Sequence, residues 1–147
     1  MQYSNRSTIY KDTSIKTSSP IKLVVMLYEG AIRFLRQAKE HTIQKDMASK
    51  CAAVDRAMAV LHHLQGTLDF DKGGEISFDL DRLYTYIGTR VFDGSANLNI
   101  AAFDEAIHLL EVLHSSWDEL SRKEQDSSVS SEVVSQQATD GRLRLNV

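Results

Sequence analysis

Two Glu-x-x-His pairs come closest to a metal site in this chain: Glu105 with His108, and Glu111 with His114. Di-iron bundles use this spacing with the pairs on different helices, so that all ligands point inward. Here both pairs belong to one predicted helix, and Glu105 and His108 lie opposite its apolar residues. We therefore expect no metal centre. His114 lies at the edge of the apolar face, where we interpret it as a partly buried, hydrogen-bonded histidine.

The other reactive residues also lack the partners that catalysis needs. His62 and His63 are adjacent, so they point about 100° apart on a helix and cannot chelate from one face. Cys51 lies on an apolar stripe, where we expect a small buried thiol and no nucleophile. Gly73-Gly74 lacks the strand, the helix start and the lysine of a phosphate-binding loop, and indicates a turn. We expect neither an enzyme nor a bound cofactor.

The composition is typical of a soluble globular domain with tails. Of 147 residues, 42% are hydrophobic and 25% are charged, and the net charge is −3. The sequence has no transmembrane segment and no secretory signal, and the single cysteine fits a reducing compartment, so we expect a cytoplasmic protein without membrane insertion. No broad basic surface is predicted, which argues against a nucleic-acid partner.

Four amphipathic helices must position these residues. Ser19-Pro20 is typical of a helix start, with Ser as N-cap and Pro at the first helical position, so the first helix is predicted from Pro20 to about His41. Apolar spacing predicts three more helices, over residues 47–68, 76–94 and 100–120. The segment from Asp69 to Glu75 is predicted as a loop. Short connections between four helices favour an all-α, antiparallel up-down four-helix bundle over residues 19–122.

Two segments of different character flank the bundle. Residues 1–18 are polar apart from four side chains and are predicted to form an extended arm. Residues 1–22 carry four basic side chains against Asp12, a net charge of +3, so the remaining chain sums to −6. Residues 121–147 contain six serines and no aromatic residue, and from this composition we predict a flexible, disordered tail over residues 123–147.

The first helix has more apolar surface than one core requires. One stripe has the spacing of a core-facing helix and comprises Leu23, Leu27, Ala31, Phe34 and Ala38. A second stripe lies beside it and comprises Ile21, Val25, Tyr28 and Ile32. The second stripe needs a further neighbour, which is another helix of the bundle, the chain's own arm or a partner. Tyr86 is likewise off the axis of its helix's apolar stripe, and an amphipathic tyrosine suits an interface.

Residues 17–38, TSSPIKLVVMLYEGAIRFLRQA, closely resemble the opening helix of the flagellin-specific secretion chaperones, the FliS family. The pattern is a Ser-Pro helix start followed by an aliphatic-rich Met-Leu-Tyr-acid-Gly-Ala run, found here at Ser19, Pro20, Met26, Leu27, Tyr28, Glu29, Gly30 and Ala31. The resemblance covers residues 10–120. Its later matches are Gly73, Gly74, Glu75, Ile76, Leu83, Tyr84, Leu110, Leu113 and Trp117.

The resemblance implies a four-helix bundle that binds the disordered C-terminal segment of flagellin in the cytoplasm. Such a chaperone blocks premature polymerisation and delivers flagellin to the flagellar type III export apparatus. We then expect the second stripe and Tyr86 to form the flagellin groove: Ile21, Val25, Tyr28, Ile32 and Tyr86. Ile9, Tyr10 and Ile15 of the arm are expected to cap this surface or compete for it.

We also expect a co-chaperone, an anti-sigma factor and an export-gate protein as further partners. We expect a monomer or a weak dimer. Two rival interpretations remain open from the sequence. One is a structural bundle that forms a homodimer through the second stripe, and the other is an enzyme or an iron-binding protein.

Overall fold

The computed structural model describes the backbone of residues 19–145 and the side chains of residues 19–127. The described residues form five helices: α2 (Pro20–Ile43), α3 (Met47–Gly66), α4 (Phe70–Gly73), α5 (Glu75–Ala96) and α6 (Ile100–Leu145). Ile9, Tyr10 and Ile15 of the predicted arm lie outside the described residues. Within the described range, no helix is long and apolar enough to span a membrane.

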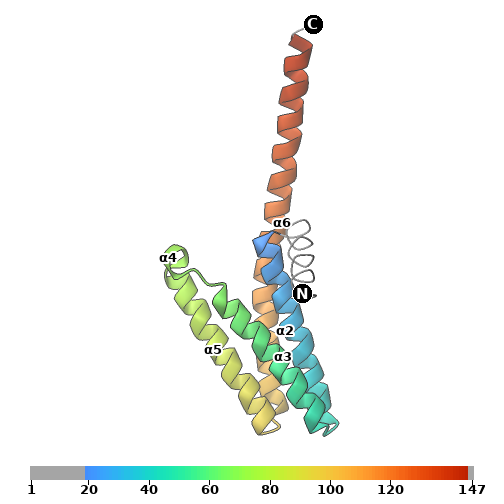
Figure 1. Ribbon diagram of the computed structural model, residues 1–147, viewed down its shortest axis with the longest axis vertical. Coiled ribbons are helices and arrows are strands. Elements are labelled where there is room, and N and C mark those ends of the chain that lie inside the picture. Colours follow the sequence, from blue (N-terminus) through green and yellow to red (C-terminus); the bar gives the residue numbers. More distant parts are fainter. Residues whose placement is uncertain (1–18, 146–147) are drawn as a thin grey trace, which may run out of the picture.

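The four long helices form an antiparallel bundle, as the sequence predicts (Figure 1). α2 packs against α3 and α6, and α5 packs against the same two helices. α2 and α5 are therefore diagonal across the bundle. This arrangement gives α2 two helical neighbours, one on each side.

The predicted helix starts are confirmed by their capping contacts. Ser19 Oγ accepts a hydrogen bond from the backbone N–H of Lys22 at 3.2 Å, and Pro20 is the first residue of α2. Asp46 caps α3 in the same way, through its contact with the backbone N–H of Ser49 at 3.2 Å. Both caps satisfy N–H groups that a helix cannot pair internally.

The segment predicted as a loop after α3 instead contains α4, a single helical turn. Asp69 caps this turn by accepting hydrogen bonds from two of its backbone N–H groups, at 3.1 and 3.0 Å. Gly74 then reverses the chain with φ +52°, a conformation that favours glycine. A Cβ at Gly73 would lie 1.9 Å from Ser77 Oγ, so a side chain at this position would clash with Ser77. The two glycines thus have separate roles in turning the chain from α4 into α5.

The bundle core contains residues from all four long helices. The largest fully buried side chains are Tyr28, Leu35, Leu61, Leu64, Ile87, Val91, Leu110 and Phe103. Gly94 allows close packing of α5 on α6, since a Cβ there would lie 3.0 Å from three atoms of the Phe103 ring. The core therefore depends on tight contacts between helices as well as on burial.

The structure corrects the assignment of the second stripe of α2. Val25, Tyr28 and Ile32 are only 5%, 0% and 8% exposed. Leu23, which was expected in the core, is 38% exposed. The reason is that α2 lies between α3 and α6, so the second stripe meets a helix of the bundle. The expectation that these three residues face a partner is wrong, and the alternative of a second neighbour within the bundle is confirmed.

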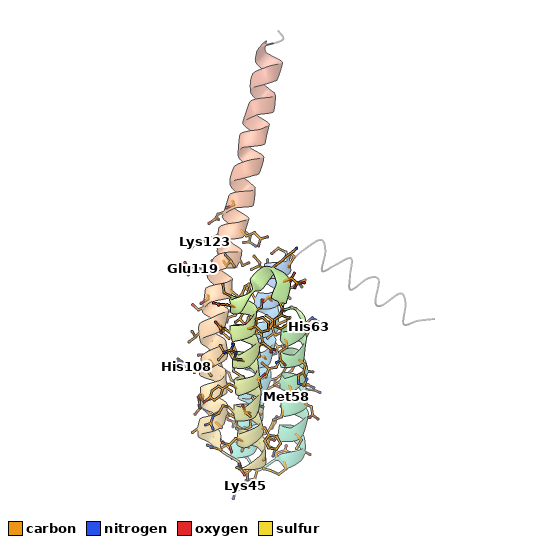
Figure 2. The ribbon with its side chains drawn as sticks, turned by 90° about the vertical axis from the view of Figure 1, so that its left-hand side faces the viewer. Lys45, Met58, His63, His108, Glu119 and Lys123 are labelled. Atoms are coloured by element: carbon orange, nitrogen blue, oxygen red, sulfur yellow. The ribbon has the colours of Figure 1, made fainter. Side chains whose placement is uncertain are left out.

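α6 continues as one helix of 46 residues to Leu145. From the sequence we expected it to end near Leu120, with a disordered tail after residue 122. In the structure, its second half projects clear of the other four helices, which agrees with a flexible tail (Figure 1). Figure 2 shows Glu119 and Lys123 near the level at which α6 leaves the bundle. The limit of the chaperone domain at residue 122 stays a prediction.

Candidate functional site

An apolar groove, here called the apical groove, opens at the end of the bundle where α2 begins and α3 ends. His63, labelled in Figure 2, marks its α3 side. The volume of the groove is about 460 Å³. Its apolar walls come from α2, the segment after α3, α5 and α6, and include Leu23, Val24, Leu27, Leu68, Ile76, Leu80 and Trp117. Four segments far apart in the sequence thus build one apolar hollow.

The rim of the apical groove carries apolar side chains that the bundle does not bury. Ile76 at the start of α5 is 70% exposed, and Leu23 on the facing helix is 38% exposed. Nearby on α4 and α5, the rings of Phe70 and Phe78 lie 4.9 Å apart, and both side chains are exposed. Clustered exposed apolar residues of this kind are typical of binding surfaces.

Two tyrosines meet at the apical groove, one lining it and the other lying behind it. Tyr84 lines the groove, and its hydroxyl is hydrogen-bonded to that of Tyr28, which is fully buried behind it. Burial raises the pKa of Tyr28, and the hydrogen bond and charge of Tyr84 raise it further. Burial also raises the pKa of Tyr84. Both hydroxyls therefore stay protonated near neutral pH and act as neutral hydrogen-bonding groups.

A second hollow of about 670 Å³ lies between α2 and α6 and is larger and more open. Its lining is mostly charged, and two pairs of these side chains bridge the two helices. Arg36 bonds to Glu111, and His114 Nε2 lies 3.0 Å from Glu29 Oε1. The expected partly buried, hydrogen-bonded His114 is confirmed. Because water already solvates these charges, the apical groove is the better site for an apolar segment.

The structure does not bring the five predicted groove residues together. Val25 and Ile32 are buried in the bundle, Ile21 is half-buried, and Tyr28 lies behind the groove floor. Tyr86 is 45% exposed and bonds to Glu105 on α6, outside the apical groove. Three of the four residues of the second stripe are buried, so they offer little surface for a homodimer in this conformation.

The groove residues that sequence reasoning missed are Leu23, Ile76, Leu80, Tyr84 and Trp117. Leu23 and Trp117 were assigned to core stripes on helical wheels, which show the direction of a side chain but not where a neighbouring helix stops. The Gly73-Gly74 turn was the available signal, since it places the start of α5 beside the end of α3.

The alternative of an enzyme or an iron-binding protein can be compared with the positions of the potential metal ligands and of Cys51. Among the described residues, no three His, Cys, Asp or Glu side chains come together as metal ligands would. Cys51 was expected to be buried but is exposed, because its face of α3 turns away from the core.

Comparison with known proteins identifies the family. The chain matches the family model of the flagellar protein FliS over residues 2–124. It is 32% identical over 124 residues to the flagellar secretion chaperone FliS of Campylobacter jejuni, covering 84% of this chain and 97% of the relative. It is 30% identical over 113 residues to FliS of Salmonella typhimurium, covering 76% and 84% respectively.

A third relative has a slightly different name. The flagellar secretion chaperone FliSB of Pseudomonas aeruginosa is 27% identical over 110 residues, which cover 75% of this chain and 87% of the relative. The family match ends at residue 124, close to the point at which α6 leaves the bundle. With its helical bundle and this match over nearly its whole length, the chain belongs to the FliS family of flagellar secretion chaperones.

Proposed function

We propose that this protein is a cytoplasmic, non-enzymatic export chaperone for flagellin. It binds the disordered C-terminal segment of flagellin, prevents premature polymerisation and hands the subunit to the flagellar type III export apparatus. The names of its relatives support the chaperone class. The observation that supports binding is the apical groove, with its apolar walls and the exposed side chains of Leu23 and Ile76 at its rim.

The energetics favour a cargo segment that contacts more than this groove. Ordering a disordered segment costs about 2–5 kcal/mol or more. Burying one large apolar side chain yields roughly 1.5–3 kcal/mol. Several such side chains are therefore needed, and the exposed Phe70–Phe78 pair beside the groove offers an adjoining apolar surface. A segment that runs from the groove across this pair would bury enough surface to bind.

In the same proposal, the N-terminal arm covers the apical groove until cargo arrives. α2 begins at Pro20, which lines the groove, so the arm starts at the groove's edge. The arm is lightly basic, whereas Asp69, which also lines the groove, and the nearby Asp71 are acidic. Ile9, Tyr10 and Ile15 would supply the apolar contacts.

Deleting residues 1–14 should raise the affinity for a flagellin C-terminal peptide, because the peptide no longer competes with the arm. Calorimetric titration gives the affinity, and circular dichroism checks that the helical content is preserved. Unchanged affinity with unchanged helicity would rule out competition. Reduced affinity would mean that the arm contributes contacts to the cargo.

The export hand-off requires contact with another protein while the groove is filled. Exposed apolar residues at the opposite end of the bundle provide surface that the cargo leaves free; they are Ile43, Met47, Phe92 and Leu98. An export-gate protein, a co-chaperone and an anti-sigma factor are the proposed partners.

A pull-down of flagellin with and without its C-terminal segment tests the central proposal. Binding that is lost only on truncation supports it. Failure of the chaperone to bind either form contradicts it.

A further inference from the structure

Two exposed phenylalanines lie on the outer face of α5, where no other described helix covers them. Phe78 is 52% exposed and Phe92 is 69% exposed. They belong to one helix, and their spacing in the sequence places them about 21 Å apart along its axis but only about 40° apart around it. Figure 1 shows α5 at one edge of the bundle. This face of α5 therefore offers apolar surface that the fold itself does not use.

The residues between the two phenylalanines complete a continuous stripe. We call it the α5 outer stripe, and it comprises Phe78, Arg82, Thr85, Thr89 and Phe92. Its alternating spacing of four and three residues is that of helices that pair along a seam. All of these side chains are exposed and lie within an arc of about 80° on the helix. The stripe thus has the form of a helix-pairing surface, with large rings at its ends and smaller threonines at its middle.

The polar groups in the middle of the stripe are already satisfied by the fold. Thr85 Oγ1 donates to the carbonyl oxygen of Asp81 at 3.0 Å and accepts a hydrogen bond from Gln65 Nε2 at 3.2 Å. Thr89 Oγ1 donates to the carbonyl oxygen of Tyr86 at 2.7 Å. A buried hydroxyl is costly mainly when it lacks a partner. Covering the two threonines would therefore leave neither hydroxyl unpaired.

The α5 outer stripe is complementary to itself. Phe78 and Phe92 are each seven residues from Thr85, one on either side. If two copies of α5 pair antiparallel around a two-fold axis at Thr85, Phe78 of each copy lies level with Phe92 of the other. The exposed Arg82 then lies on the same side of the pair as the acidic Asp93 of the second copy, so opposite charges flank the ring contacts. A surface for an unrelated partner needs no such symmetry.

From this symmetry we infer that the α5 outer stripe is a contact between two copies of this chain, arranged antiparallel around Thr85. The inference goes beyond the proposed function and does not rest on it. Burying a phenylalanine covers about 150–250 Å², so the exposed parts of the four rings supply about 350–600 Å². Stable interfaces bury about 1,200–2,000 Å² in total. The dimer is therefore weak, with a dissociation constant between about 10 μM and 1 mM.

Sedimentation equilibrium of the full-length protein over this concentration range tests for the dimer. The average mass should rise with concentration towards that of two chains. Phe92→Ser removes one ring from each end of the interface and should weaken dimerisation by about tenfold or more. Ile76→Ser is the matched control, because Ile76 is 70% exposed on the same helix but lies outside the stripe. A monomer at every concentration, or a dimer that the two variants affect equally, would overturn the inference.

A disulfide cross-link tests the antiparallel arrangement. Cys51→Ser first removes the exposed native thiol. In this background, Thr85→Cys places one thiol from each copy at the two-fold axis, where an oxidant should yield a covalent dimer. Ile76→Cys should not cross-link, since the two copies of this position lie about 27 Å apart along the helices, beyond the reach of a disulfide. No cross-link through Thr85→Cys, or equal cross-linking of both variants, would overturn the arrangement.

Discussion

Ile76 and Phe92 are two apolar side chains of α5 that water reaches to almost the same extent, 70% and 69%. Only Ile76 lines the apical groove, since Phe92 lies near the other end of the helix. At the residue scale, exposure alone therefore does not identify a binding residue. What distinguishes Ile76 is that neighbouring apolar side chains from α2, α6 and the segment after α3 lie around the same hollow.

This pair gives a prediction with a built-in control. Ile76→Ser should weaken binding of the flagellin C-terminal peptide by roughly tenfold or more, because about 1.5–3 kcal/mol of apolar burial is lost. Phe92→Ser removes an equally exposed apolar side chain outside the groove and should leave the affinity unchanged. Calorimetric titration measures both. Equal effects of the two substitutions would place the cargo elsewhere.

At the scale of elements, the turn between α5 and α6 shows how a helix end is fixed. The backbone N–H of Asn99 bonds to the carbonyl of Gly94 at 3.1 Å, and Leu98 between them has φ +51°. This is the position and bonding of a Schellman cap, at which glycine is preferred. A leucine in this left-handed conformation is strained, and its side chain is 48% exposed.

Replacing Leu98 by glycine should therefore stabilise the protein by about 0.5–1 kcal/mol. The midpoint of urea unfolding should rise while its slope stays the same. Leu120 is similarly exposed but lies inside α6, so Leu120→Gly should destabilise by about 1 kcal/mol. A loss of stability in Leu98→Gly would show that the exposed leucine makes stabilising contacts.

The same turn gives the protein a pH-dependent contribution to stability. Hydrogen bonds from Asn97 and Asn99 hold the pKa of Asp93 below its usual value, and Arg90 adds a smaller effect of the same sign. Because the pKa is lower in the folded state, this contribution is present above the unfolded-state pKa and is lost as the pH falls through the folded-state pKa.

Asp93→Asn should therefore flatten the dependence of stability on pH below about pH 5. Urea unfolding at several pH values measures this dependence. Asn97→Ala removes one of the donors and should reproduce part of the effect. An unchanged pH profile in both variants would mean that the turn does not hold the carboxylate in solution.

At the scale of the whole molecule, the two ends of the bundle differ. At the end opposite the groove, the buried Lys50 Nζ donates to the carbonyl oxygen of Ser95 at 2.7 Å and ties the start of α3 to the end of α5. At the other end, the helices enclose the apical groove, and α6 continues beyond it (Figure 1). The apical groove and the Lys50–Ser95 contact thus lie at opposite ends of the bundle.

Removing residues 125–147 should leave the unfolding midpoint and the peptide affinity unchanged. The reason is that this part of α6 projects clear of the other helices, and the family match ends at residue 124. Thermal unfolding and calorimetric titration of the truncated chain test both expectations. Weaker peptide binding would instead show that the cargo also contacts the projecting helix.

The sequence by itself determined the helical class and the places where helices begin. Ser19-Pro20 and Asp46 act on their own helix ends, and apolar spacing repeats within one helix, so these signals are local. The motif in α2 was sufficient to identify the family. The partial burial of His114 also followed from its place at the edge of an apolar face.

Only the tertiary structure decided which apolar residues stay exposed at the surface. Two adjacent stripes of α2 are equivalent on a helical wheel, and the neighbours α3 and α6 determined that Tyr28 and Val25 are buried while Leu23 is exposed. Likewise, the bond between Tyr28 and Tyr84 joins residues 56 positions apart. Burial depends on where neighbouring helices lie and where they end, and the pattern within one helix does not contain that information.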